Sequence, residues 1–134
     1  MTRIFCFIFS ILFFQYLQAA SVDYEVSMPK PHTHYFEVTM HITDLKKEFI
    51  DIQMPTWAPG SYLIREFSRN VEGLKATANE KEIETKKLNK NTWRLFSKNT
   101  ANIKVTYAVY AFELSVRTSF IDATHGYFNG TSLF

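Results

Sequence analysis

The stretch YFEVTMHI, residues 35–42, decides the fold, because apolar and polar side chains alternate along it. If the chain is extended, one side of it carries Phe36, Val38, Met40 and Ile42, and the other side carries the polar residues between them. An alternation of period two is typical of a β-strand with one buried face. The stretch therefore predicts a half-buried strand rather than a helix.

The same alternation recurs along the rest of the chain. Further strands are predicted at residues 50–54, 74–78 and 103–109, with two more at 22–28 and 91–96. The polar segments 79–80 and 98–102 separate strands and are interpreted as hairpin connections. With seven or eight short strands, and one helical turn at most within residues 61–71, the pattern favours an all-β fold, an antiparallel β-sandwich or a curved pair of sheets.

The pattern changes phase near residue 110. Apolar residues occupy odd positions from 103 to 109, whereas Tyr110, Phe112, Leu114 and Val116 occupy even ones. A single extra residue in a strand produces such a change. We therefore expect a bulge or a bend at residues 109–111, where the strand passes between sheets or around a corner.

The N-terminus is strongly apolar. Arg3 precedes the uncharged run IFCFIFSILFFQYL (residues 4–17), and small residues follow at positions 19–21. This order is typical of a secretory signal peptide, and the run is shorter than the roughly 20 residues of a membrane-spanning helix. We expect residues 1–20 to form a signal helix, with a retained membrane anchor as the alternative, and residues 21–134 to form one domain of an exported protein, periplasmic or extracellular.

Composition excludes several function classes. The 134 residues carry a formal net charge of +2, which is too small to indicate a nucleic-acid-binding surface. The single cysteine, Cys6, lies inside the apolar run, so the mature domain would have neither a disulfide nor a thiol nucleophile. A domain of this size must then be held by an ordinary hydrophobic core.

No catalytic motif is found in the sequence. It contains no H-E-x-x-H, no G-x-S-x-G and no glycine-rich phosphate loop. His32 and His34 are spaced to share one face of a strand, but His41 falls on the opposite face and a third ligand is missing. We expect the pair to be structural or hydrogen-bonding residues at a strand entrance. Residues 129–131 (Asn-Gly-Thr) match a glycosylation acceptor, yet are better interpreted as a turn.

Two stretches are denser in aromatic and charged residues than a plain core requires. They are MPTWAPGSYLIREFSRNV (residues 54–71) and YAFELSVRTSFIDATHGYFNGTSLF (residues 110–134). Together with YEVSMPKPHTHYFEV (residues 24–38), they resemble the N-terminal domain of the glycyl-aminopeptidase family (metallopeptidase family 61). These are zinc metallopeptidases with a thermolysin-like catalytic domain and a PDZ domain. The resemblance covers essentially the whole mature chain.

The resemblance implies an all-β, saddle-like domain that precedes the catalytic domain and packs against it. The family's H-E-x-x-H helix, its third glutamate ligand and its acid/base glutamate have no counterpart here, so the chain is expected to be truncated before the catalytic domain. Zinc needs three protein ligands and an open position. We therefore expect no metal and no catalytic residue in this chain, and zinc only in the catalytic domain.

Three functional hypotheses remain open. The first is a non-catalytic domain that braces the catalytic domain of an exported zinc aminopeptidase and borders its cleft; peptide substrate would be bound only through that domain. The second is a stand-alone exported β-sandwich that binds a ligand, peptide or glycan. The third is a truncated gene product without a function of its own. For the first hypothesis, the candidate interdomain or cleft-rim contacts are Tyr62, Arg65, Glu66 and Arg69.

Overall fold

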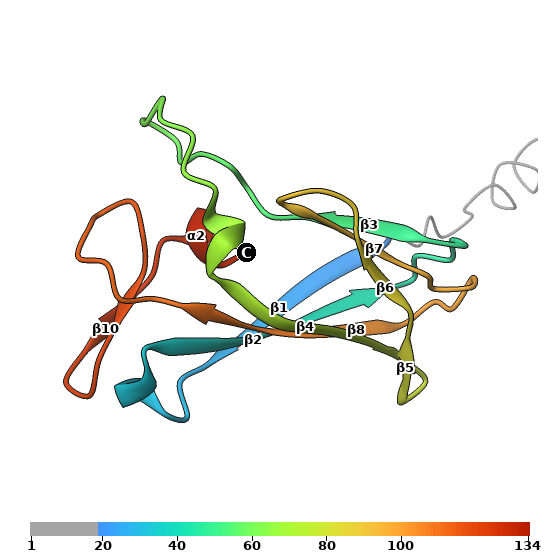
Figure 1. Cartoon of the computed structure of the whole chain (residues 1–134). Helices are drawn as coiled ribbons and strands as arrows, with labels where there is room; N and C mark the ends of the chain where they lie inside the picture. Colours follow the sequence, from blue (N-terminus) through green and yellow to red (C-terminus); the bar gives the residue numbers. More distant parts are fainter. Residues whose placement is uncertain (1–18) are drawn as a thin grey trace, which may run out of the picture.

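The computed structural model describes residues 19–134, which form two packed antiparallel β-sheets and a small two-stranded sheet (Figure 1). The order of the five-stranded sheet is β1 (Ser21–Ser27), β2 (Tyr35–Thr43), β8 (Ile103–Tyr110), β4 (Val71–Ala78) and β5 (Lys81–Ile83). The order of the three-stranded sheet is β3 (Ile50–Gln53), β7 (Thr92–Leu95) and β6 (Thr85–Lys87). The two-stranded sheet pairs β9 (Phe120–Ile121) with β10 (Gly126–Tyr127). The predicted all-β antiparallel fold is confirmed.

Strand β2 lies between β1 and β8 in the larger sheet and has the predicted burial pattern. Its apolar side chains at positions 36, 38, 40 and 42 are all buried, while the residues between them are partly or fully exposed. It pairs with β8 from Tyr35 opposite Tyr110 to Ile42 opposite Ile103 without a register shift. The alternation therefore matches the pleat along the whole strand, which fixes the register.

The second sheet covers one end of this buried face. Ile50 and Leu95 from the three-stranded sheet pack with Met40, Ile42 and Val105 from the larger one in a single core cluster. Leu95 and Val105 are completely buried. Because both inner faces interdigitate, the arrangement is a β-sandwich.

The sandwich is open along one side. A cleft of about 300 Å³ lies between the sheets and is lined mainly by apolar side chains of β1, β2, β3, β4 and β7. Tyr24 lies at this cleft with Phe134, their ring centroids being 4.6 Å apart. The two sheets are therefore in full contact over only part of their facing surfaces.

The expected bulge near residue 110 is absent, although the chain does leave the large sheet there. The pairing with β2 continues to Tyr110, after which Ala111 donates its N–H to the His34 carbonyl and Phe112 forms a bridge with Phe120. Ala111 is buried and Phe112 is half exposed. The prediction of a bulge is therefore wrong, because the apolar residues at even positions belong to a mostly exposed loop. The alternative, that the chain passes from one sheet to another at residues 109–111, is confirmed.

A bulge occurs in β4 instead. The pairing of β4 with β8 shifts between Glu72 and Lys75, where two residues lie opposite one. Gly73 lies in this step with φ +61, a left-handed conformation that glycine adopts without the steric cost of a side chain.

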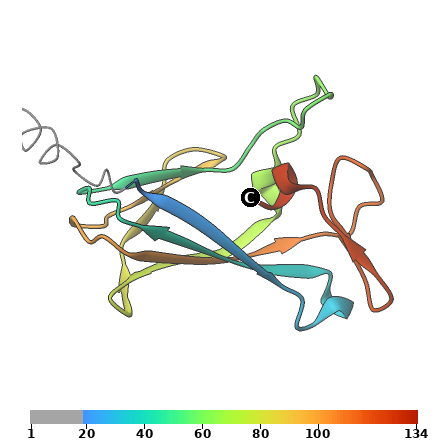
Figure 2. The ribbon, with the colours of Figure 1, turned by 180° about the vertical axis from the view of Figure 1, so that it is seen from behind.

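Two short helices gather at one end of the sandwich, where the two longest loops also lie (Figure 2). The predicted helical turn is the 3₁₀ helix η2 (Phe67–Asn70), and it packs beside the helix α2 (Gly130–Leu133). The Leu133 side chain is fully buried against the large sheet, and its carbonyl accepts a hydrogen bond from the Tyr107 hydroxyl at 3.0 Å. Burial of the Tyr107 hydroxyl, with a smaller contribution from Tyr24, raises its pKa. This end of the molecule carries the candidate site.

The predicted signal segment, residues 1–20, lies outside the described residues except for its last two. Within residues 19–134 no helix is long and apolar enough to cross a membrane.

Candidate functional site

A loop between β3 and η2 projects from the sandwich and is drawn in green in Figures 1 and 2. We call residues 56–65 the arm. Its base is closed by a hydrogen bond of 2.7 Å from the Arg65 N–H to the Thr56 carbonyl. Within the arm, the Ser61 N–H donates to the Ala58 carbonyl at 3.0 Å around Pro59 and Gly60, whose φ is +77. This is a type II turn, with proline at its second position and glycine in the left-handed conformation at its third.

The arm is anchored by a small separate core. Met54, Ala58, Phe67 and Trp93 are buried together, so the residues before, within and after the arm share one apolar cluster with β7. Phe67 is only 2% exposed. The cluster gives the arm a fixed base on the sandwich.

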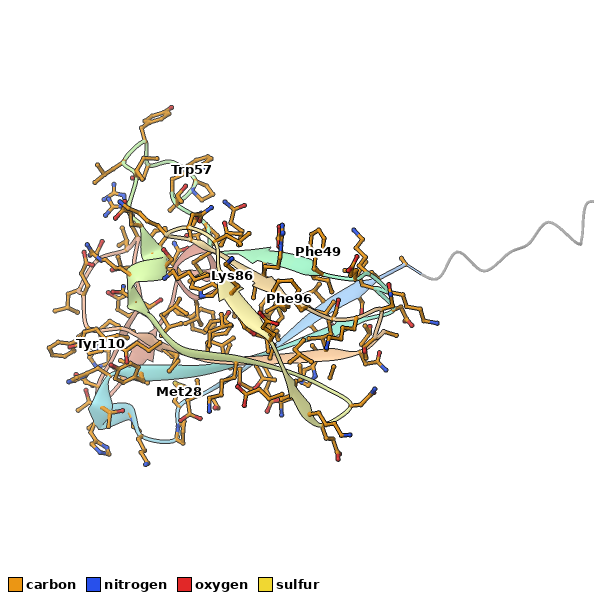
Figure 3. The ribbon with its side chains drawn as sticks, turned by 45° about the vertical axis from the view of Figure 1, so that its right-hand side comes forward. Met28, Phe49, Trp57, Lys86, Phe96 and Tyr110 are labelled. Carbon is orange, nitrogen blue, oxygen red and sulfur yellow. The ribbon has the colours of Figure 1, made fainter. Side chains whose placement is uncertain are left out.

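Beyond this base, the arm presents apolar side chains to water. Tyr62 is fully exposed, Leu63 and Ile64 are more than half exposed, and so is Trp57. Figure 3 shows Trp57 on the projecting segment, away from the sheets. Several adjacent exposed apolar residues on one loop are unusual for a monomer and typical of a surface that another molecule covers.

A second loop, residues 111–119, lies beside the base of the arm. Thr118 closes it by donating its hydroxyl to the Glu113 carbonyl at 3.1 Å, and the Tyr127 hydroxyl accepts a hydrogen bond from the Ser115 N–H at 3.1 Å. Leu114 and Val116, near its tip, are more than three-quarters exposed. Both loops are therefore held by hydrogen bonds at defined positions while their apolar side chains face outward.

A small cleft of about 160 Å³ separates the two loops. It is lined by Leu63, Ile64, Arg65, Phe67, Arg69, Asn70, Glu113 and Thr118. Arg65 and Arg69 bring two positive charges to it and Glu113 brings one negative charge. None of these three side chains forms an ion pair with a partner in the described part of the chain. The cleft thus joins unpaired charges with an apolar rim.

Glu66 has a different environment although it lies between the two arginines in sequence. Its backbone is left-handed (φ +48), which turns the chain from the arm into η2, and its carbonyl accepts the Arg69 N–H. Its carboxylate is 2.6 Å from Lys90. The hydrogen bond and charge of Lys90, and more weakly the charge of Arg69, lower the pKa of Glu66. An exposed pair of this kind fixes geometry more than it stabilises the fold.

The structure brings three of the four predicted contact residues together. Arg65 and Glu66 directly precede η2 and Arg69 lies on it. Tyr62 is farther along the arm and lines neither of the two clefts that these residues line. The prediction missed Leu63 and Glu113, which line the cleft with Arg65. The apolar residues at even positions after 109 mark the second loop, but their alternation predicts a strand.

The histidines do not form a metal site. His32 lies on the 3₁₀ helix η1 (Pro31–Thr33) and His34 follows it in a left-handed conformation, so they do not share a strand face as the spacing predicts. The His34 Nδ1 lies 2.7 Å from the Ile121 carbonyl oxygen, and the His34 ring lies 3.8 Å from that of Phe112. The expected structural role of His34 at the entrance to β2 is confirmed. Among residues 19–134 no group of three or more possible ligands could hold a metal ion.

Comparisons with known proteins agree with this architecture. The family model described as Peptidase M61 N-terminal domain matches residues 23–134. The crystal structure of the aminopeptidase N family protein from Idiomarina loihiensis is similar to this chain, with a TM-score of 0.79 and 36% sequence identity. The match covers 85% of this chain and 19% of that protein, so the chain spans about a fifth of its length. No curated protein matches the chain.

Proposed function

Because this chain belongs to the Peptidase M61 family and forms its N-terminal domain, we propose that it is the non-catalytic β domain of an exported zinc aminopeptidase. In this role it braces the catalytic domain, and its arm borders the active-site cleft. The candidate contacts are Tyr62, Arg65, Glu66 and Arg69, all at the end of the sandwich that carries both loops.

One observation supports this proposal most strongly: the exposed apolar side chains are concentrated on two loops at one end. Tyr62, Leu63 and Ile64 on the arm, and Leu114 and Val116 on the second loop, are all more than half exposed. Hydrogen bonds hold both loops in place, and a separate small core anchors the arm. A surface that is both ordered and apolar matches a permanent interface rather than a mobile loop.

Catalysis would belong to the other part of such an enzyme. The described residues offer no three-ligand set, and a catalytic zinc needs three protein ligands with an open position. The zinc, the peptide-binding pocket and any preference for N-terminal glycine would therefore lie in the catalytic domain. Export is supported by the signal-like order of residues 1–20.

A second function is favoured by one other feature. The cleft between the sheets has a volume of about 300 Å³ and a mainly apolar lining, which suits a small apolar ligand. A stand-alone binding module would use this cleft and would be soluble without a partner. A truncated product without function would instead aggregate through its apolar loops.

The test begins with the coding DNA beyond the codon for Phe134, read in all three frames for an H-E-x-x-H motif and a downstream glutamate. An in-frame motif would support the brace, and the encoded polypeptide should then hydrolyse aminoacyl substrates in a zinc-dependent way. A motif found only after a frameshift or stop would indicate a decayed gene. No motif in any frame would overturn the proposal in favour of the binding module.

The brace itself is tested in the polypeptide that the extended frame encodes. Replacing Leu63 and Ile64 by serine should raise deuterium exchange in both loops and lower the temperature of inactivation. The matched control is Leu88, which is also exposed but lies outside both loops. Equal effects of the two changes would contradict a brace at this end.

A further inference from the structure

The cleft between the arm and the second loop contains an arginine whose hydrogen bonding is incomplete. The Nε of Arg65 is buried and has no acceptor within the described part of the chain. A buried donor without an acceptor is unfavourable, because it has lost its hydrogen bonds to water and gained none in return. The side chain that carries this donor lines the cleft together with Arg69.

Another arginine of the same fold shows what a paired guanidinium looks like. Arg94 donates through Nε and Nη2 to the two carboxylate oxygens of Asp51, both at 2.7 Å. Its guanidinium also lies over the Phe49 ring, 4.0 Å from the centroid. The two parallel hydrogen bonds match the shape of a carboxylate, which is the planar anion that this fork recognises best.

Glu113 is the acidic side chain in the cleft, and it does not accept a hydrogen bond from the Arg65 Nε. Neither Arg65 nor Arg69 lies within ion-pair distance of it, and it is exposed on the second loop. The two positive charges therefore exceed the one negative charge where the loops meet. This imbalance favours an incoming anion.

We propose that this cleft binds a carboxylate from an aspartate or glutamate side chain of the catalytic domain, with Arg65 as the principal donor and Arg69 as a second positive charge. The surroundings favour this occupant, because Leu63 and Ile64 form an apolar rim that a free small anion would not need. Arginine is enriched among the residues that carry most of the binding energy of protein interfaces. The inference rests on the proposed function, whose interface it deepens.

The first experiment measures the site in the full chain without its partner. Acetate is the probe, and the readout is the Nε–Hε resonance of Arg65 in a ¹⁵N-correlated NMR spectrum, with chloride and acetamide as controls at matched concentration. We expect a saturable downfield shift with acetate alone, while the resonance of Arg94 stays in place. Arg69→Gln should weaken the acetate affinity about tenfold, because one charge-assisted interaction is lost.

Glu113→Gln keeps the test falsifiable. If Glu113 were the true partner of Arg65, this change would move the Arg65 resonance before any acetate is added, and that result would overturn the inference. An unchanged resonance followed by equal or tighter acetate binding is the expected result. A shift produced equally by chloride or acetamide, or no saturable shift, would also overturn it.

The second experiment separates this inference from the proposed function. In the polypeptide of the extended frame, Arg65→Gln should raise deuterium exchange in both loops, while Arg117→Gln, on the same second loop but outside the cleft, should not. If the serine changes at Leu63 and Ile64 raise deuterium exchange in the loops but Arg65→Gln does not, the brace stands and the carboxylate site is wrong. If acetate binds but none of these changes affects the loops, the site stands as an anion site and its assignment to a catalytic-domain side chain is wrong.

Discussion

Replacing Phe67 by alanine should release the arm from the sandwich and destabilise the whole domain. Phe67 is 2% exposed and packs with Met54, Ala58 and Trp93, which lie before, within and opposite the arm. Removing its ring deletes the contacts that these side chains share. The structure therefore predicts a loss in the free energy of unfolding together with greater mobility of the arm.

The size of the effect follows from the burial. A buried phenylalanine replaced by alanine loses about 3–5 kcal/mol, from lost transfer free energy and from the cavity left behind. This is a large part of the roughly 5–15 kcal/mol that stabilises an ordinary domain. Phe67→Leu keeps most of the volume and should cost less than about 1.5 kcal/mol. Tyr62→Ala, at a fully exposed site, should change stability by no more than about 0.5 kcal/mol.

Urea unfolding followed by tryptophan fluorescence measures these differences. Trp93 belongs to the same cluster as Phe67, and a Trp57→Phe background removes the signal of the exposed tryptophan. The melting temperature should fall by about 12–20 °C for Phe67→Ala, at roughly 4 °C per kcal/mol. If Phe67→Ala and Tyr62→Ala cost equally little, the cluster does not anchor the arm and the reasoning fails.

Three further predictions follow from local geometry. Hydrogen bonds from the Thr124 hydroxyl and from the N–H groups of residues 124 and 125 lower the pKa of Asp122 from 3.8 to about 2. The ionised carboxylate therefore stabilises the folded domain above pH 4, and this stabilisation is lost as the pH falls through about 2. A carboxyl ¹³C titration that places this pKa near 4 would contradict the prediction. Gly60→Ala should cost about 1–2 kcal/mol in urea unfolding because φ is +77 with open space around the added carbon, and a neutral effect would argue against the turn. Ser132→Ala should lower the free energy of unfolding by about 1–3 kcal/mol, because it leaves the buried Ser119 hydroxyl without its partner at 2.7 Å. Replacing both Ser119 and Ser132 by alanine should cost less than the single change in the same assay.

The sequence was sufficient to predict the strands whose alternation matches a two-faced sheet. In β2 the apolar side chains at positions 36, 38, 40 and 42 are buried as expected, and the Pro59–Gly60 turn forms where its residue types indicate. These features depend on neighbours in the chain, so local pattern is enough. The division of the strands into two sheets depends on distant pairings such as Val71 with Val109, which alternation does not encode.

The candidate site was predicted only in part for the same reason. Apolar residues at alternate positions predict a buried face, yet Phe112, Leu114 and Val116 are exposed. They lie where the chain has left the large sheet, and the loop carries the same alternation as a strand. The helix α2 was missed because Asn129, read as part of a turn, instead caps it by accepting the Thr131 N–H at 3.1 Å. Partners outside the chain, and caps of very short helices, leave little trace in local periodicity.

The closure at the base of the arm has a consequence for how this domain can diversify. Since the Thr56 carbonyl accepts the Arg65 N–H at 2.7 Å, the residues between them form a loop whose two ends meet at one point of the sandwich. Each doubling of the length of such a loop adds only about 0.6 kcal/mol to the entropic cost of closing it. Homologous domains could therefore carry arms of different length and composition on an unchanged scaffold, each fitted to the shape of its own neighbour.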